Sequence, residues 1–171
     1  MMVKGNRLVS LALALAATAC LSACGGSPGG GSATSESQYA VPPSPAVPFA
    51  QARFAFAPVT GAPATVLMTI SSQLGKEAYA QHVTLVPSGD TTANYVVKGY
   101  LSAVGDVSGT ILVYVWDIFD TSGRRVHRIS GQETTTGGSQ NDPWAGVDTA
   151  TATNVARRTI ASIVAWGSAS R

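Results

Sequence analysis

Few side chains in this chain of 171 residues have the type and spacing needed for chemistry. The two thiols, Cys20 and Cys24, lie close to the N-terminus, and the two histidines, His82 and His127, are far apart in the sequence. A metal site needs several histidine, cysteine or carboxylate ligands brought together. No serine has the spacing of a nucleophile elbow, and no glycine-rich phosphate loop follows a predicted strand. The sequence therefore predicts no enzyme activity, no cofactor and no metal.

Two carboxylates, Asp117 and Asp120, lie three residues apart in a predicted strand. Side chains at that spacing point to opposite faces of a sheet, so the two are not expected to form an acid–base pair. His127 lies between basic neighbours, and as a general base it would need an orienting carboxylate. His82 is expected to be exposed at a helix–strand junction. These groups do not assemble a catalytic site in the sequence.

The first 23 residues have the pattern of a secretory signal peptide. Lys4 and Arg7 precede an apolar run at 8–19, which is shorter than the roughly 20 residues that span a membrane. Without these two cations the chain has 11 − 2 = 9 basic residues against 9 acidic ones, so the rest is formally neutral. A neutral chain is not typical of proteins that bind nucleic acid.

The segment Leu21-Ser22-Ala23-Cys24 resembles the lipobox of bacterial lipoproteins. In that family the cysteine thiol receives a diacylglycerol, the signal peptidase cleaves before the cysteine, and the freed amine is usually acylated. The resemblance implies that residues 1–23 are removed and that Cys24 is the lipid attachment site, carrying palmitate-type chains. Two or three acyl chains on one residue would give a lasting membrane anchor. Cys20 is the weaker acceptor, because Ala17 stands where the motif has leucine.

The residue after the lipidated cysteine bears on which membrane holds the protein. In enteric bacteria an aspartate at that position favours retention in the inner membrane, and here the position is Gly25. The resemblance therefore implies an outer-membrane lipoprotein facing the periplasm, with inner-membrane retention or surface exposure as alternatives. Residues 24–48 are rich in glycine, serine and proline and predict a flexible tether.

The folded domain is expected to comprise residues 49–171. Alternating or β-rich segments predict strands at 53–58, 83–86, 94–104, 110–119 and 124–131. Apolar residues at helical spacing predict helices at 63–81 and 147–164. The predicted order is β-α-β-β-β-α, an α+β two-layer sandwich in which two helices cover one face of a mixed sheet that contains a three-stranded antiparallel meander. Both faces of the 110–119 strand are apolar, so this strand is expected to be central.

The meander also resembles a pattern found in cell-envelope proteins. An apolar strand ends in Asp117-Ile118-Phe119-Asp120-Thr121-Ser122-Gly123 and returns through Arg124-Arg125-Val126, as in the N-terminal domain of TolB. It is also similar to outer-membrane lipoproteins that activate penicillin-binding proteins and to curli and transport-accessory lipoproteins. This resemblance concerns the fold, which does not fix function.

Four residues are candidates for binding a partner: Trp144, Arg124, Arg125 and Arg128. Trp144, in a polar loop, either fills the core beneath the last helix or anchors a partner. The arginines either protect a solvated sheet edge or contact an acidic partner, a lipid headgroup or a glycan. Strand alternation predicts that Arg124 and Arg128 share one sheet face and that Arg125 lies on the other.

These observations together predict a lipid-anchored, non-enzymatic envelope protein that binds another envelope protein, such as a peptidoglycan synthase or an assembly or transport complex. The alternative is a lipid, glycan or small-molecule carrier that works with a transporter. That alternative predicts a closed apolar pocket.

Overall fold

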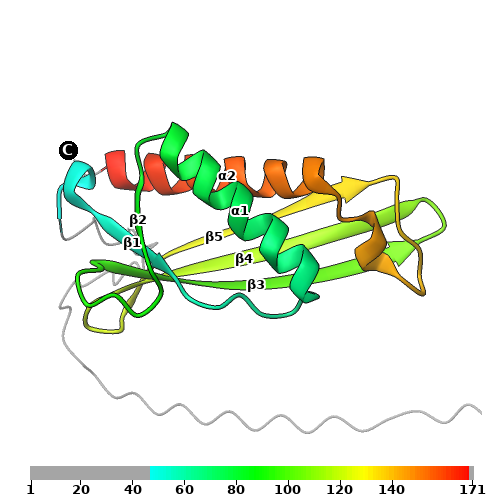
Figure 1. The fold of residues 1–171 in the computed structure, drawn as a ribbon, viewed down its shortest axis with the longest axis horizontal. Helices are drawn as coiled ribbons and strands as arrows, with labels where there is room; N and C mark the ends of the chain where they lie inside the picture. The colour runs from blue at the N-terminus through cyan, green and yellow to red at the C-terminus, as the bar shows by residue number, and fades with distance from the viewer. Residues whose placement is uncertain (1–46, 170–171) are drawn as a thin grey trace, which may run out of the picture. The chain divides into compact units, whose positions relative to one another are not determined.

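The computed structural model describes residues 47–169 of the chain. The predicted signal peptide, Cys24 and the tether up to residue 46 lie outside these residues. A mixed five-stranded sheet of order β2-β1-β3-β4-β5 has two helices on one face (Figure 1). The elements are η1 (Phe49–Gln51), β1 (Arg53–Phe56), α1 (Ala64–Ala80), β2 (Thr84–Val86), β3 (Tyr95–Asp106), β4 (Gly109–Asp120), β5 (Arg125–Thr135), η2 (Pro143–Gly146) and α2 (Thr149–Ser168). The predicted α+β class and the mixed sheet are confirmed.

Three details of the prediction are wrong. The order β-α-β-β-β-α has three strands after the first helix, whereas the structure has the four that the residue ranges predict, so the order leaves out one strand. The last strand continues to Thr135 rather than ending near residue 131, since it pairs with the whole length of β4. β4 is paired on both sides, but the central strand of the sheet is β3.

Helix α1 follows from its apolar spacing. Val66, Ile70, Leu74 and Ala78 recur every four residues and are all buried, so one stripe of the helix faces the sheet. Pro63 precedes the first helical residue in an extended conformation. The helix crosses between β1 and β2, which are parallel and therefore need such a connection.

Helix α2 begins at a side-chain cap. The carboxylate of Asp148 accepts a hydrogen bond of 2.8 Å from the Thr151 backbone N–H, so Asp148 is the N-cap. Gly167 lies inside the helix, which continues to Ser168. The ring of Phe49 packs so closely on Gly167 that a Cβ there would overlap it.

The core lies between the sheet and the two helices. On β4 it receives four buried side chains in alternation: Leu112, Tyr114, Trp116 and Ile118. Trp116 is fully buried, and its ring lies over Gly99 on β3, where a Cβ would overlap the indole. The helices therefore cover the Trp116 face of β4.

Both hairpin turns of the meander are closed by an aspartate. Asp106 accepts hydrogen bonds from the backbone N–H and hydroxyl of Ser108, at 2.7 and 2.6 Å. Asp120 does the same with Ser122, at 3.0 and 2.6 Å. These bonds hold the pKa of each carboxyl below its usual range. The turns fix the register of all three long strands.

Candidate interaction surface

The sheet face opposite the helices is the largest feature that the core does not use. No other element of residues 47–169 packs on this face of β3, β4 and β5, which we call the open face (Figure 1). The register aligns its side chains in rows across the three strands. The rows are Lys98–Asp117–Arg128, Tyr100–Val115–Ser130, Ser102–Val113–Gln132 and Val104–Ile111–Thr134.

Apolar side chains gather in the middle of the open face. Tyr100 is 50% exposed, Val104 62%, and Ile111 and Val113 39% each. With the half-buried Val115 they form one group on two paired strands, which we call the apolar patch. Single exposed apolar residues are ordinary, whereas a contiguous group on a rigid sheet is typical of a binding surface.

Next to the apolar patch, one buried carboxylate organises the basic residues. The side chain of Asp117 is 7% exposed and accepts two hydrogen bonds from the Arg128 guanidinium, at 2.6 and 2.7 Å. Arg125 lies 3.6 Å from the same carboxylate. The hydrogen bonds from Arg128, helped by the charge of Arg125, hold the pKa of Asp117 below its usual range. The carboxylate therefore stays ionised and positions both guanidiniums.

Lys98 completes this group, which we call the charged end. It pairs in register with Asp117, and its ammonium lies 4.8 Å from the centre of the Phe119 ring. Arg124 pairs with Asp120 at 3.1 Å beside it. Four cations and two carboxylates give 4 − 2 = +2, so the charged end favours an anionic contact.

The prediction that Arg125 lies on the other face from Arg128 is wrong. A β-bulge between Ile118/Phe119 and Arg125 shifts the register of β5, so strict alternation fails at its first residues. The shift brings Arg125 and Arg128 to one carboxylate, while Arg124 stays in the turn with Asp120. β5 is an edge strand of the sheet, and both interpretations of these arginines, edge protection and partner contact, stay predictions.

Trp144 lies away from the arginines, in η2. It is half-buried and packs against the core, and η2 contacts β3 and β4. The hydroxyl of Thr110 on β4 donates a 2.8 Å hydrogen bond to the Pro143 carbonyl, which holds η2 in place. A core contact for Trp144 is therefore present, and partner binding through it stays a prediction.

The histidines occupy different environments. His82 is exposed, as expected, and has a left-handed backbone with φ of 57°. His127 is half-buried and stacks on the Trp166 ring of α2, with ring centres 5.3 Å apart. Burial lowers the pKa of His127, so it is neutral at pH 7. Within residues 47–169 no three histidine, cysteine or carboxylate residues are grouped as a metal site would need.

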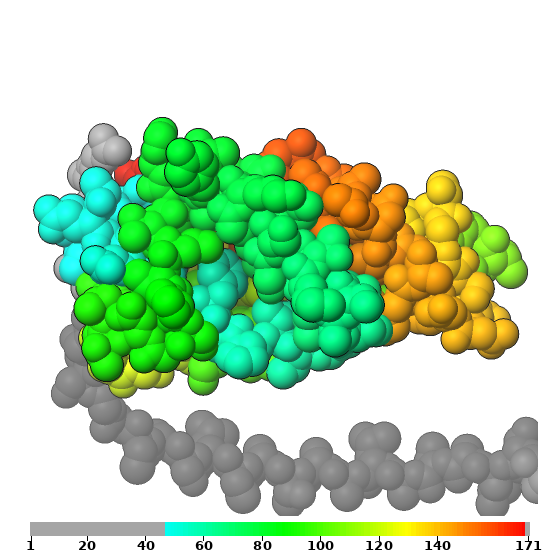
Figure 2. Space-filling model, in the orientation of Figure 1, coloured from blue at the N-terminus to red at the C-terminus, as the bar shows by residue number. Residues whose placement is uncertain are grey.

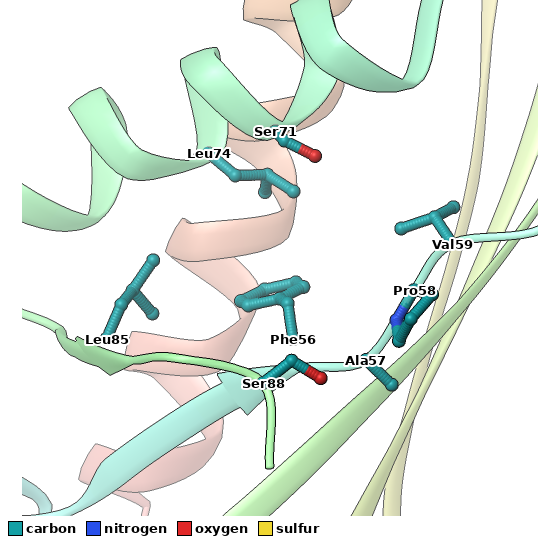
Figure 3. A pocket seen from close by; sticks show the side chains of 8 residues that line it. All are labelled: Phe56, Ala57, Pro58, Val59, Ser71, Leu74, Leu85 and Ser88. Carbon is teal, nitrogen blue, oxygen red and sulfur yellow. The ribbon is translucent and has the colours of Figure 1, made fainter. Parts of the chain in front are cut away.

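A pocket of about 250 Å³ lies between α1 and the segment after β1 (Figure 3). Phe56, Val59, Leu74 and Leu85 line it, together with Ser71 of α1. Figure 2 shows the surface hollowed here, so the pocket is half-open rather than closed. It is smaller than the roughly 300–1,000 Å³ that hold drug-sized ligands. Carriage of a lipid or small molecule stays a prediction.

The sequence missed the residues of the apolar patch. Strand propensity places Tyr100, Val104 and Ile111 in strands but does not say that they are exposed, although both faces of β4 are apolar. A strand with two apolar faces and helices for only one of them is the signal that predicts an exposed patch.

None of the helices among residues 47–169 has the length and hydropathy to cross a membrane.

No family model and no curated protein matches the chain. Among solved structures it is similar to a dodecameric PelC variant from Paraburkholderia phytofirmans, with a TM-score of 0.50, 14% identity, and coverage of 72% of this chain and 94% of that one. It is similar to a DUF330-family protein from Xanthomonas campestris, with a TM-score of 0.53, 10% identity, and coverage of 75% and 93%.

The similarity to TolB from Acinetobacter baumannii is weaker. The TM-score is 0.38 at 12% identity, covering 66% of this chain and 28% of TolB. A score at this level does not establish a shared fold. The chain shares its α+β fold with PelC and with the DUF330-family protein. The sequence identities to these two proteins are low, so the similarity concerns the fold and not the function.

Proposed function

We propose that the chain is a lipid-anchored cell-envelope protein that acts as a non-enzymatic interaction module, and that its open face binds another envelope protein. The observation that carries the proposal is the open face itself, where a contiguous apolar patch adjoins a rigid charged end. An apolar centre beside fixed charges is the composition of a specific protein interface. The matching partner surface has apolar residues beside acidic ones.

The anchor in this proposal comes from the sequence. A lipid on Cys24 followed by the tether at 24–48 would hold the domain at a membrane surface and leave the open face free to meet its partner. The fold is that of PelC, whose solved form is a dodecamer, so association of this chain with itself through the open face is the competing outcome.

The anchor predicts the behaviour of Cys24→Ala. This variant is expected to take up no radioactive palmitate, because the lipid acceptor is gone. It is also expected to keep its signal peptide. The matched control is Cys20→Ala, which should be labelled and cleaved like the parent. Fractionation, autoradiography and the intact mass give the three readouts. Labelling that persists in Cys24→Ala and disappears in Cys20→Ala would move the anchor to Cys20.

The open face predicts a site-specific contact in intact cells. A photoreactive amino acid at position 100 should form an adduct with one partner protein, because Tyr100 lies in the apolar patch. Adding Val113→Glu should reduce this adduct by about tenfold or more, since a carboxylate in a desolvated apolar contact costs over 1.4 kcal/mol. The readout is the adduct band, identified by mass spectrometry.

The matched control places the same charge on the helix side. Tyr79 on α1 is 87% exposed, and Tyr79→Glu should leave the adduct at position 100 unchanged. An adduct of the chain with a second copy of itself would replace the partner proposal by self-association. If Val113→Glu leaves the yield of the adduct unchanged, the proposal that the open face binds the partner is wrong.

A further inference from the structure

Strand β5 forms a long edge of the sheet whose outward backbone groups have no partner among residues 47–169. The backbone N–H of Asp120 donates to the Arg124 carbonyl at 3.0 Å, so the even-numbered residues of β4 direct their backbone groups toward β5. Their register partners in β5 are the odd-numbered residues from His127 to Thr135. The residues between these, 128, 130, 132 and 134, therefore direct their N–H and C=O groups away from the sheet, and none of them has a backbone hydrogen bond there.

The regular part of this edge lacks the usual protection against strand pairing. Proteins protect edges with prolines, bulges or charged side chains. The bulge of β5 lies at Arg125, before the regular run from His127 to Thr135. The two charges within that run are occupied on their own chain, Arg128 by Asp117 and Glu133 by Arg158 at 2.8 Å.

The opposite edge of the sheet differs. β2 is only three residues long and is followed directly by Pro87, which has no N–H to donate. It offers too short a ladder for stable pairing. Of the two edges, β5 is the one built to accept another strand.

We infer that the occupant of this edge is β5 of a second copy, paired antiparallel about Gly131. Gly131 is the middle residue of the run from His127 to Thr135, so this register uses the whole run in both copies. It sets Ser130 opposite the partner's Gln132 and Arg128 opposite the partner's Thr134. Each such pair exchanges two backbone hydrogen bonds, so the joined edge gains about eight.

The side chains agree with this register. On the open face a cation meets a threonine, and a serine meets a glutamine, both of which can hydrogen-bond across the strands. On the helix face Ile129 meets Glu133 and Gly131 meets itself, so no like charges are opposed. Pairing about Arg128 instead would place two guanidiniums opposite each other, which is unfavourable.

The helix layer leaves room for the second copy. Arg158 lies beside β5, because it holds Glu133, and Trp166 lies over His127. The residues four and seven positions after Arg158, on the same helix face, are Ser162 and Ala165. These side chains are small, so Arg158, which Glu133 holds at 2.8 Å, is the one long side chain among these three residues of α2. Pairing would join the two sheets into one and make the two open faces continuous.

The register is tested with cysteine pairs in the full-length chain. One tagged copy with Ser130→Cys and a differently tagged copy with Gln132→Cys are made together in bacterial cells and oxidised. The paired positions have Cα atoms about 5.5 Å apart, within disulfide range. A disulfide-linked product carrying both tags is expected, at least fivefold above that from two Ser130→Cys copies, whose Cα atoms lie about 7–8 Å apart.

Two controls make the result specific. The parent chain, which keeps Cys20 and Cys24, sets the background under the same oxidant. Thr134→Pro in both copies removes an outward N–H without touching the pairing with β4, and should lower the product at least fivefold, whereas Thr134→Val should not. Absence of the doubly tagged product, or equal yield from same-position pairs, overturns the inference. Neither result depends on whether the open face binds its partner.

Discussion

Trp116→Ala is expected to lower the free energy of unfolding by about 3–5 kcal/mol. Trp116 is fully buried on β4, meets Phe56 edge-to-face with ring centres 5.6 Å apart, and fills the space over Gly99. Its removal would leave a cavity that a glycine on the neighbouring strand cannot fill. The midpoint of thermal unfolding should fall by roughly 10–25 °C in a domain of this size. Urea unfolding followed by circular dichroism measures the change.

Trp144→Ala is the matched control, since it removes the same side chain from a half-buried position. Trp144→Ala should lower the free energy of unfolding much less than Trp116→Ala does, because part of the Trp144 ring is in water in the folded state. Equal losses would show that η2 carries as much of the core as β4. A loss in partner binding by Trp144→Ala without a change in unfolding would instead assign Trp144 to an interface.

Arg128→Ala should destabilise the domain through the carboxylate that it leaves behind. Asp117 is 7% exposed in its side chain and would keep only Arg125, at 3.6 Å. A buried charged acceptor left without its hydrogen bonds costs about 2–3 kcal/mol at neutral pH. Arg125→Ala removes the same charge, but Arg125 donates no hydrogen bond to Asp117. The free energy of unfolding should therefore fall clearly less in Arg125→Ala than in Arg128→Ala. Urea unfolding of both variants at pH 7 makes the comparison.

The pH dependence separates this cause from a loss of packing. In the parent the folded pKa of Asp117 is lowered, so its stabilising contribution is present above the unfolded pKa of 3.8 and is lost as the pH falls through the folded pKa. Without Arg128 the folded pKa rises, and the penalty disappears once the carboxyl is protonated. The difference in free energy of unfolding between the parent and Arg128→Ala should therefore become smaller below about pH 4. A gap that stays constant from pH 7 to pH 3 would point to packing.

Much of the fold follows from local patterns in the sequence. The four-residue spacing of Val66, Ile70 and Leu74 predicts α1, and the turns at Asp106 and Asp120 predict the meander. These features are local, so propensity and periodicity are sufficient to place them. The β-rich residues 83–86 also predict the short β2, although the order β-α-β-β-β-α leaves it out.

The details of the surface depend on pairing between distant segments. A single bulge places Arg125 beside Asp117, and strict alternation in the sequence gives the opposite result. Stacking of His127 on Trp166 joins β5 to α2, and no local pattern contains it. The open face could be predicted only by counting how many helices are available to cover two apolar faces of β4.

The parallel pairing of β1 on both of its sides has a mechanical consequence. Phe49 is near the start of the described domain, and beyond it the chain enters β1, which is held by parallel ladders on both sides. A pull on the N-terminal side would load these ladders along the strand direction, so that their hydrogen bonds resist together rather than one after another. In Figure 1 the β3–β4 turn lies at the far end from this attachment. The ladders of β1 would thus carry the tension, and the long meander of β3, β4 and β5 would remain undistorted.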